Sequence, residues 1–327
     1  MPLGDNSSFT RLHLENSLIA FPHILQNKGI FMLSLLRTVA FLPLAFVIGC
    51  KATAEIESTD LSPQPPIWVV SDADSEITLY PTLHIMPENV SWKSDELSKR
   101  LAEADEVWFE IMPGSEADPA LQMKTIELGM APGSSVSSNM SEEEVAALKE
   151  LLTPLGVPFE AADSMRPWML STMASVGLLV DNGFDPSAGV EKQLLPMTEG
   201  KKIRALETAE SQLQMLASIP DEVQLNMLKD MLGEMDETVT DLQELVKDWS
   251  VGDVADLENE LLDEMKAEYP AAFNAIFTQR NKNWVDQIEI EMNGSGTDFI
   301  AVGAGHLVGE DGVPAMLKAR GYDVKRL

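Results

Sequence analysis

The stretch "FIAVGAGHLVG", residues 299–309, ends an apolar run with two glycines and a histidine, His306. A short apolar run bounded by glycine is typical of a buried β-strand. Near the other end of the domain, "LYPTLHIM", residues 79–86, places His84 in the same position after a second apolar run. If both strands are buried they share one sheet, and ligands of open α/β sheets lie at the carboxyl ends of strands. We therefore expect the two histidines to lie close together.

The order of elements places strands at both ends of the chain and helices in the middle. The predicted strands are 67–71, 76–84, 106–111, 202–206, 298–305 and 322–327, the first two forming a hairpin. The predicted helices are 92–104, 141–152, 166–180, most of 220–292, and 312–320. This order predicts an α/β (α+β) fold, with a central mixed sheet built from N- and C-terminal strands and a large helical insertion.

Composition restricts the classes of partner. The chain has 327 residues, 45% of them hydrophobic, which is enough to bury a sizeable core. The formal net charge of −30 argues against nucleic-acid binding, because phosphates would be repelled. A solvated acidic surface, as in proteins of salty environments, explains this charge; a dedicated cationic partner is the alternative.

The N-terminal region resembles a lipoprotein signal. Residues 32–50 begin with Met32, contain one arginine and an apolar run, and end in "VIGC" at Cys50, the only cysteine of the chain. The run is short for a membrane span and fits a secretory signal. We expect a lipid on Cys50 to attach the mature chain to a membrane surface. The alternative is cleavage at "ATA", residues 52–54, and secretion without a lipid.

Domain boundaries follow from this signal. Residues 1–31 precede it and suggest an over-extended reading frame, so Met32 is the expected start. Residues 51–66 are polar and proline-rich, as in a tether, and residues 67–327 form the folded domain. The expected location is the cell envelope on the periplasmic side, with the chain anchored by lipid or secreted to the periplasm.

Three polar residues at strand ends suggest a metal site. Of the four histidines, His13 and His23 lie upstream of Met32, which leaves His84 and His306 in the domain. Glu110 ends the strand "EVWFEI", where an unpaired carboxylate would be costly to bury. Two imidazoles and one carboxylate leave an open coordination position, as catalytic metal sites do. The alternative is that each histidine makes an ordinary hydrogen bond at its strand end.

Seven motifs in residues 67–327 make the chain resemble the TraB/GumN family, which is related to the Tiki metalloproteases. They are "LYPTLHIMP", "VWFEIMP", "RPWML", "GVEKQL", "LETAESQLQML", "QRNKNWVDQI" and "FIAVGAGHLVGEDGVPAMLKARGYDV". The resemblance implies a Tiki/erythromycin-esterase-like fold. It also implies a centre made of two G-x-x-H motifs and a glutamate.

The family's site residues map onto this sequence one by one. The second G-x-x-H motif is Gly303 to His306, and the glutamate is Glu110. The first motif ends at His84 but begins with Pro81 where the family has glycine; proline lacks a backbone donor. Whether this change abolishes catalysis is left open. The resemblance also suggests that Arg280 reaches the site, to bind a substrate carboxylate or an oxyanion; a salt bridge to an acidic residue is its alternative.

Three functions remain open at this point. The first is a metal-dependent, peptidase-like hydrolase, in which zinc, manganese or cobalt is held by His84, Glu110 and His306 and the substrate is a peptide or another acyl compound. The second is a metal-free esterase that uses a histidine as base, with Glu110 orienting it. The third is a non-catalytic surface lipoprotein that binds a metal or another ligand.

Overall fold

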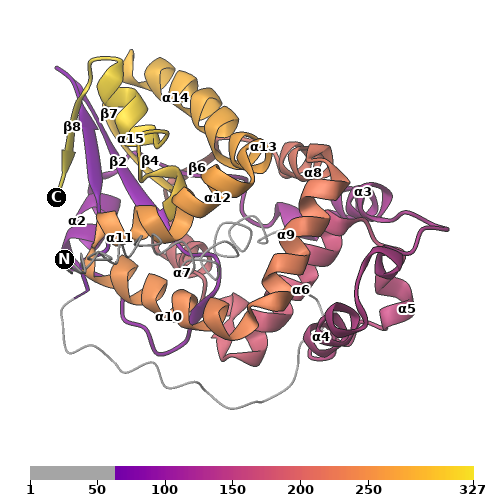
Figure 1. The fold of residues 1–327 in the computed structure, drawn as a ribbon. Coiled ribbons are helices and arrows are strands. Elements are labelled where there is room, and N and C mark those ends of the chain that lie inside the picture. The colour runs from indigo at the N-terminus through magenta and orange to yellow at the C-terminus, as the bar shows by residue number, and fades with distance from the viewer. Residues whose placement is uncertain (1–62) are drawn as a thin grey trace, which may run out of the picture.

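The structure, a computed structural model, describes residues 63–327 (Figure 1). The predicted segments 1–31 and 32–50, with Cys50, lie outside the described residues, as does most of the tether. Its last residues, 63–66, pack on the domain: the backbone N–H of Gln64 donates to the Ser250 carbonyl at 2.8 Å. None of the helices in residues 63–327 is both long enough and apolar enough to cross a membrane.

A six-stranded sheet and a helical middle confirm the predicted fold class. The strands are β1 (Trp68–Ser71), β2 (Ser75–Thr82), β4 (Glu106–Phe109), β6 (Lys202–Ala205), β7 (Gly296–Gly303) and β8 (Asp323–Arg326). Two short strands, β3 (Met86–Pro87) and β5 (Phe184–Asp185), form a separate antiparallel pair. The large sheet has the order β6-β4-β7-β2-β1-β8.

The helices fill the intervals between these strands. They are α2 (Asp95–Glu103), α3 (Pro119–Gly129), α4 (Glu142–Leu152), α5 (Phe159–Ala162), α6 (Pro167–Asp181), α7 (Val190–Leu194), α8 (Ala209–Ser218), α9 (Asp221–Gly233), α10 (Met235–Val251), α11 (Val254–Glu258), α12 (Glu264–Glu268), α13 (Pro270–Phe273), α14 (Gln279–Met292) and α15 (Val313–Ala319). In Figure 1 the sheet lies at the left, and α3, α4, α5, α6 and α9 form a helical lobe at the right.

Pairing in the sheet brings the ends of the chain together, as the sequence predicts. The hairpin β1–β2 is antiparallel, with Trp68 opposite Leu79. Strand β7, from the C-terminal part of the chain, lies between β2 and β4 and runs parallel to both. Strand β6 is parallel to β4. The strands β6, β4, β7 and β2 therefore all end at the same edge of the sheet.

Local signals in the sequence explain several element boundaries. Ser94 caps α2 by accepting from the N–H of Leu97, and Ser141 and Glu144 form the predicted capping box of α4. Helix α6 begins at Pro167 and is buried almost throughout its first three turns. This apolar helix therefore serves as the core of the helical lobe, against which α4 and α9 pack.

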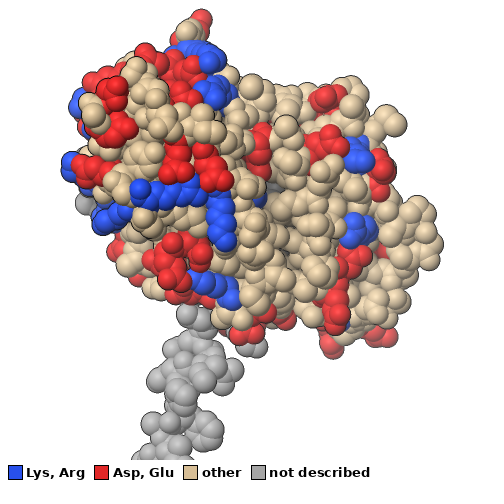
Figure 2. Space-filling model, turned by 90° about the horizontal axis from the view of Figure 1, so that it is seen from above, with Lys and Arg blue, Asp and Glu red and all other residues tan. Residues whose placement is uncertain are grey.

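The molecular surface is acidic, as the net charge requires. Figure 2 shows groups of Asp and Glu spread across the viewed face between other residues, with Lys and Arg mostly over one half of it. Pairs such as Arg320 with Asp286 and Lys266 with Asp311 account for part of this mixture. Exposed pairs of this kind contribute little stability, so the core and the buried polar groups decide the fold.

Candidate active site at the carboxyl ends of the strands

Four neighbouring parallel strands each deliver a polar residue to one edge of the sheet. Glu110 directly follows β4, and Glu207 lies just after β6. His84 lies just beyond the end of β2, and His306 ends the short helical turn after β7. The end of an open parallel sheet is where ligands bind in α/β proteins. The structure thus brings together residues separated by more than two hundred positions in the chain.

Gly303 lies at the centre of this group. A Cβ placed on Gly303 would be 3.1 Å from Glu110 Oε1, 3.6 Å from His306 Cδ2 and 3.7 Å from His84 Nε2. Three polar side chains therefore crowd around Gly303, where a residue with a side chain would press on them. The backbone N–H of Gly303 donates to Glu110 Oε1 at 2.8 Å, which fixes that carboxylate.

Glu110 is held as an anion by several donors. Its Oε2 accepts from Arg280 Nη2 at 2.6 Å and from Gln212 Nε2 at 3.0 Å. Burial alone would raise the pKa of Glu110, but the Arg280 charge, the charges of the two imidazoles at the acidic pH where they are protonated, and the Gly303 N–H together lower it to about 2. A carboxylate with so low a pKa is a poor general base at neutral pH and a good ligand for a cation.

His306 has a defined tautomer. Its Nδ1 lies 2.6 Å from Asn281 Oδ1, and the amide group of Asn281 is oriented because its Nδ2 donates to the Asp311 carbonyl at 2.7 Å. Nδ1 of His306 therefore carries the proton, and Nε2 accepts from Arg280 Nη1 at 2.9 Å. The imidazole stacks near Trp284, with ring centroids 4.3 Å apart.

His84 is oriented by a carboxylate that the sequence did not single out. Its Nδ1 lies 2.5 Å from Glu191 Oε1, on α7, and the Thr82 hydroxyl donates to the same carboxylate. Burial would raise the pKa of Glu191, but His84 and Thr82 lower it. The backbone of Gly189 lies against His84, since a Cβ there would be 2.0 Å from the His84 carbonyl oxygen. The motif "GVEKQL" thus positions the first histidine.

Pro81 fits the strand that carries His84. Strand β1 pairs with β2 only as far as Leu79, so β7 alone flanks Pro81. A proline is tolerated where its missing N–H has no partner strand. The carbonyl of Pro81 accepts from the indole N–H of Trp249 on α10 at 3.2 Å. The departure from the family's glycine therefore leaves β2 paired and His84 in place.

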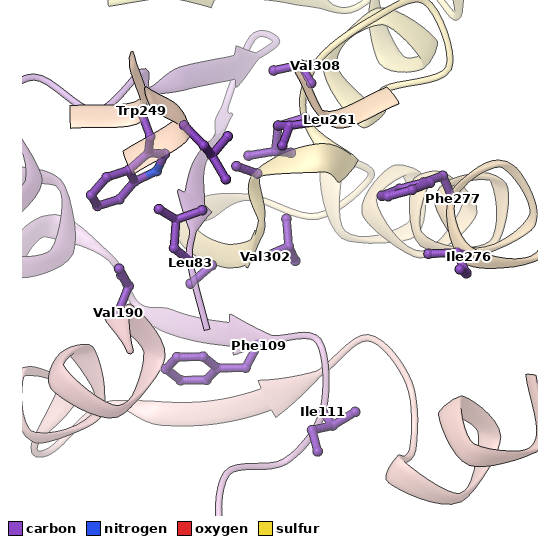
Figure 3. Close-up of a cluster of buried hydrophobic side chains, with 14 of the residues drawn as sticks. Leu83, Phe109, Ile111, Val190, Trp249, Leu261, Ile276, Phe277, Val302 and Val308 are labelled. Atoms are coloured by element: carbon purple, nitrogen blue, oxygen red, sulfur yellow. The ribbon is translucent and has the colours of Figure 1, made fainter. Parts of the chain in front are cut away.

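Buried apolar side chains are the chain neighbours of these polar residues (Figure 3). Leu83, Phe109 and Val302 directly precede His84, Glu110 and Gly303 in the chain, and all three are buried. The figure shows them with Val190 of α7, Trp249 of α10, Leu261, and Ile276 and Phe277 of the segment before α14. Such surroundings strengthen the charge interactions at the strand ends.

The donor set fits a divalent metal ion in chemistry and charge. Each histidine has Nδ1 bound to an oxygen, an arrangement typical of metal-binding histidines. Nε2 of His306 and Oε1 of Glu110 are 3.9 Å apart, a separation that one ion can bridge with bonds of about 2.1 Å. The carboxylates of Glu110, Glu191 and Glu207 outnumber the single guanidinium of Arg280, so the group is anionic when the imidazoles are neutral.

The distances between the possible ligand atoms limit how such an ion could bind. Among residues 63–327, one group of three acidic or histidine side chains has ligand atoms all within 4.8 Å of one another, and it is Glu106, Glu291 and Asp298. His84 is therefore not as close to Glu110 and His306 as a fully formed site requires. The acidic group Glu106, Glu291 and Asp298 is bridged by Arg204, which bonds to both glutamates.

Comparison with known proteins gives the family. The model of the TraB/PrgY/gumN family matches residues 66–326. The chain belongs to this family. It is similar to the protein YbaP of Escherichia coli (strain K12) and to YbaP of Shigella flexneri, each 23% identical over 256 residues, covering 78% of this chain and 92% of the relative. No solved structure matches the chain significantly. The family resemblance expected from the seven sequence motifs is thereby confirmed.

Proposed function

We propose that this TraB/PrgY/gumN protein is a metal-dependent hydrolase of acyl compounds, peptides included. The observation that carries the proposal is the convergence of His84, Glu110 and His306 around Gly303. Both imidazoles have Nδ1 held by an oxygen acceptor, and neutral nitrogen with carboxylate oxygen suits zinc, manganese or cobalt. When bound, such an ion would polarise a substrate carbonyl and activate a water molecule.

The residues of the chain have distinct proposed roles in that reaction. Glu110 and His306 hold the cation, since both already share one cation, Arg280. His84, whose Nδ1 is held by the Glu191 carboxylate, would offer its Nε2 as the third ligand. Arg280 bonds to Glu110 and His306, and the N–H groups that a bound ion would release from them would face developing negative charge.

A turnover assay on one set of samples tests this function. The full chain is stripped with a chelator, reloaded with zinc, manganese or cobalt, and assayed on panels of peptides and esters. We expect no turnover without an ion and recovery with at least one of them. Activity should fall as the pH drops below the range where histidines are neutral, because protonated imidazoles do not bind metal.

Two outcomes of the assay favour the other functions. Full activity of the metal-free chain would contradict the proposal and favour the esterase with a histidine base, for which the pair of His84 and Glu191 offers the geometry. A folded, metal-loaded chain without turnover on either panel would favour a non-catalytic surface protein that binds the ion. Pro81 stands where the family's first motif has glycine, so this second outcome would indicate that the change to proline accompanies a loss of catalysis.

We further propose that the mature chain is attached to a membrane surface by a lipid on Cys50, on the periplasmic side of the cell envelope. The motif "VIGC" after an apolar run supports this proposal. Replacing Cys50 by Ser should block processing or release the chain into the soluble fraction when cells are fractionated. If the Ser variant is cleaved after Ala54 and remains where the unmodified chain does, the lipid anchor is wrong.

A further inference from the structure

Every N–H donor of Arg280 is used inside the protein. A guanidinium has five such donors. Nε donates to Glu207 Oε1 at 2.9 Å, and Nη1 donates to the Ile276 carbonyl at 3.1 Å and to His306 Nε2 at 2.9 Å. Nη2 donates to Glu110 Oε2 at 2.6 Å and also to Glu207. Arg280 is 6% exposed, so these bonds are shielded from water.

Two of these five bonds fall on the groups assigned to the metal ion. The unprotonated nitrogen of His306 has one lone pair, and Arg280 Nη1 occupies it. An ion that binds His306 therefore has to displace this N–H. Glu110 differs, because Arg280 uses Oε2, while Oε1 accepts from the Gly303 N–H and keeps a second lone pair.

The other three bonds hold the arginine after such a displacement. Two of them go to Glu207 and one to the Ile276 carbonyl, and neither residue belongs to the metal-binding set. The guanidinium also lies 4.7 Å from the ring centre of Trp284, which favours a cation at that place. Arg280 thus keeps a charged partner when it leaves His306 and Glu110.

The backbone before Arg280 has an unusual conformation. Residues Asn274–Thr278 form a π-helical turn that leads directly into α14. Single π-turns inside helices occur frequently at functional sites. Ile276, whose carbonyl accepts from Arg280, lies in this turn. The guanidinium is therefore anchored to a local irregularity of the helix.

We propose that Arg280 is an internal competitor of the divalent ion, which occupies His306 and Glu110 in the metal-free chain and moves onto Glu207 when the ion binds. This inference rests on the proposed function, since it assumes that the ion binds these two residues. Its consequence is that metal affinity is weaker than the ligands alone would give. Binding and the position of the arginine are then coupled.

Calorimetric titration of the full chain with Zn²⁺ tests the competition. Replacing Arg280 by Gln removes the competing cation, and we expect the variant to bind Zn²⁺ at least about tenfold more tightly than the unmodified chain. Arg100→Gln is the matched control, because Arg100 also pairs with two glutamates, Glu76 and Glu96, but lies outside the site. Its affinity should equal that of the unmodified chain. Equal or weaker binding by the Arg280 variant would overturn the inference.

The same titrations separate a failure of the proposed metal centre from a failure of the proposed competition by Arg280. If neither the unmodified chain nor the Arg280 variant binds Zn²⁺, the centre itself is wrong and the competition falls with it. Binding that persists when His306 is replaced by Ala in the Arg280→Gln background has the same meaning. Binding by the variant alone would support the competition strongly.

A measurement on the unmodified chain avoids any folding defect of the variant. With arginine labelled by ¹⁵N and ¹³C, the buried guanidinium of Arg280 should give slowly exchanging N–H signals in the metal-free state. One equivalent of Zn²⁺ should shift those signals, because two of the five bonds are lost. If stoichiometric Zn²⁺ binds without changing the guanidinium signals of Arg280, the inference is overturned.

Discussion

Replacing Glu110 by Gln is expected to destabilise the folded chain by about 3–5 kcal/mol at neutral pH, the range for breaking a buried ion pair. Glu110 is 7% exposed and accepts from the Gly303 N–H, Gln212 and Arg280. A glutamine offers one acceptor oxygen, and its amide N–H₂ would face donors. Urea unfolding of the variant and of the unmodified chain at pH 7 measures the difference in the free energy of unfolding.

The pH dependence of this effect follows from the pKa of Glu110. It falls from the ordinary 4.5 to about 2 in the folded chain, so the charge stabilises the fold by about 3 kcal/mol at neutral pH. Since the folded-state pKa is the lower one, this stability is present above about pH 4.5. It is lost as the pH falls from about 4.5 toward 2. The difference in stability between the Glu110→Gln variant and the unmodified chain should therefore shrink over that interval.

Glu106→Gln is the control for the Glu110 variant, because Glu106 begins the strand that Glu110 follows. Glu106 is half-buried and pairs with Lys202 and Arg204 near the surface. Its replacement should change the free energy of unfolding by less than about 1 kcal/mol. A Glu110 variant no less stable than the Glu106 variant at pH 7 would mean that Glu110 is not the buried, paired anion described above.

Replacing Gly303 by Ala is expected to weaken binding of a divalent ion about 10–100-fold, the range found for changes beside metal ligands. The new Cβ would lie 3.1 Å from Glu110 Oε1 and would press on the side chains of His84, Glu110 and His306 that surround Gly303. The backbone of Gly303, with φ −50° and ψ 134°, is open to alanine, so the fold itself should be retained. Titration calorimetry with Zn²⁺ gives the affinity, and circular dichroism verifies the fold.

Gly233→Ala is the control for the Gly303 variant. Gly233 ends α9, and a Cβ there would meet no atom within 4 Å. This variant should bind the ion as the unmodified chain does and be slightly more stable, by up to about 1 kcal/mol. If Gly303→Ala binds the ion with unchanged affinity, the cation does not bind to the side chains around Gly303.

Much of the sheet could be predicted from the sequence because its strands are short apolar runs. These apolar runs coincide with the hairpin of β1 and β2, the strand β4 and the closing strands β7 and β8. The position of β7 beside β2 follows from joining the two histidine-bearing strands in one sheet. Helix α6 could be predicted because its nearly unbroken apolar run exceeds the length of a strand.

The partners of the site residues could not be predicted in the same way. Glu191 lies more than a hundred residues from His84, on a short helix, and only the packing of α7 against the end of β2 brings them together. Gln212, which donates to Glu110 and Glu207, is one polar residue among many in an amphipathic helix. The sequence allowed Arg280 either a substrate or a salt bridge; its bonds to Glu110, Glu207 and His306 depend on three separate strands. Long-range pairing of this kind leaves no local pattern.

The central claim, that His84, Glu110 and His306 form a metal site, is tested most directly by metal content. The purified full chain is stripped, loaded with zinc, manganese or cobalt, freed of unbound ion and analysed for its elements. We expect about one ion per unmodified chain, as in a catalytic site with protein ligands and one open position, and far less in His84→Ala and His306→Ala variants that keep their fold. An unmodified chain without bound ion, or a His306 variant that retains the full ion content, would contradict the claim.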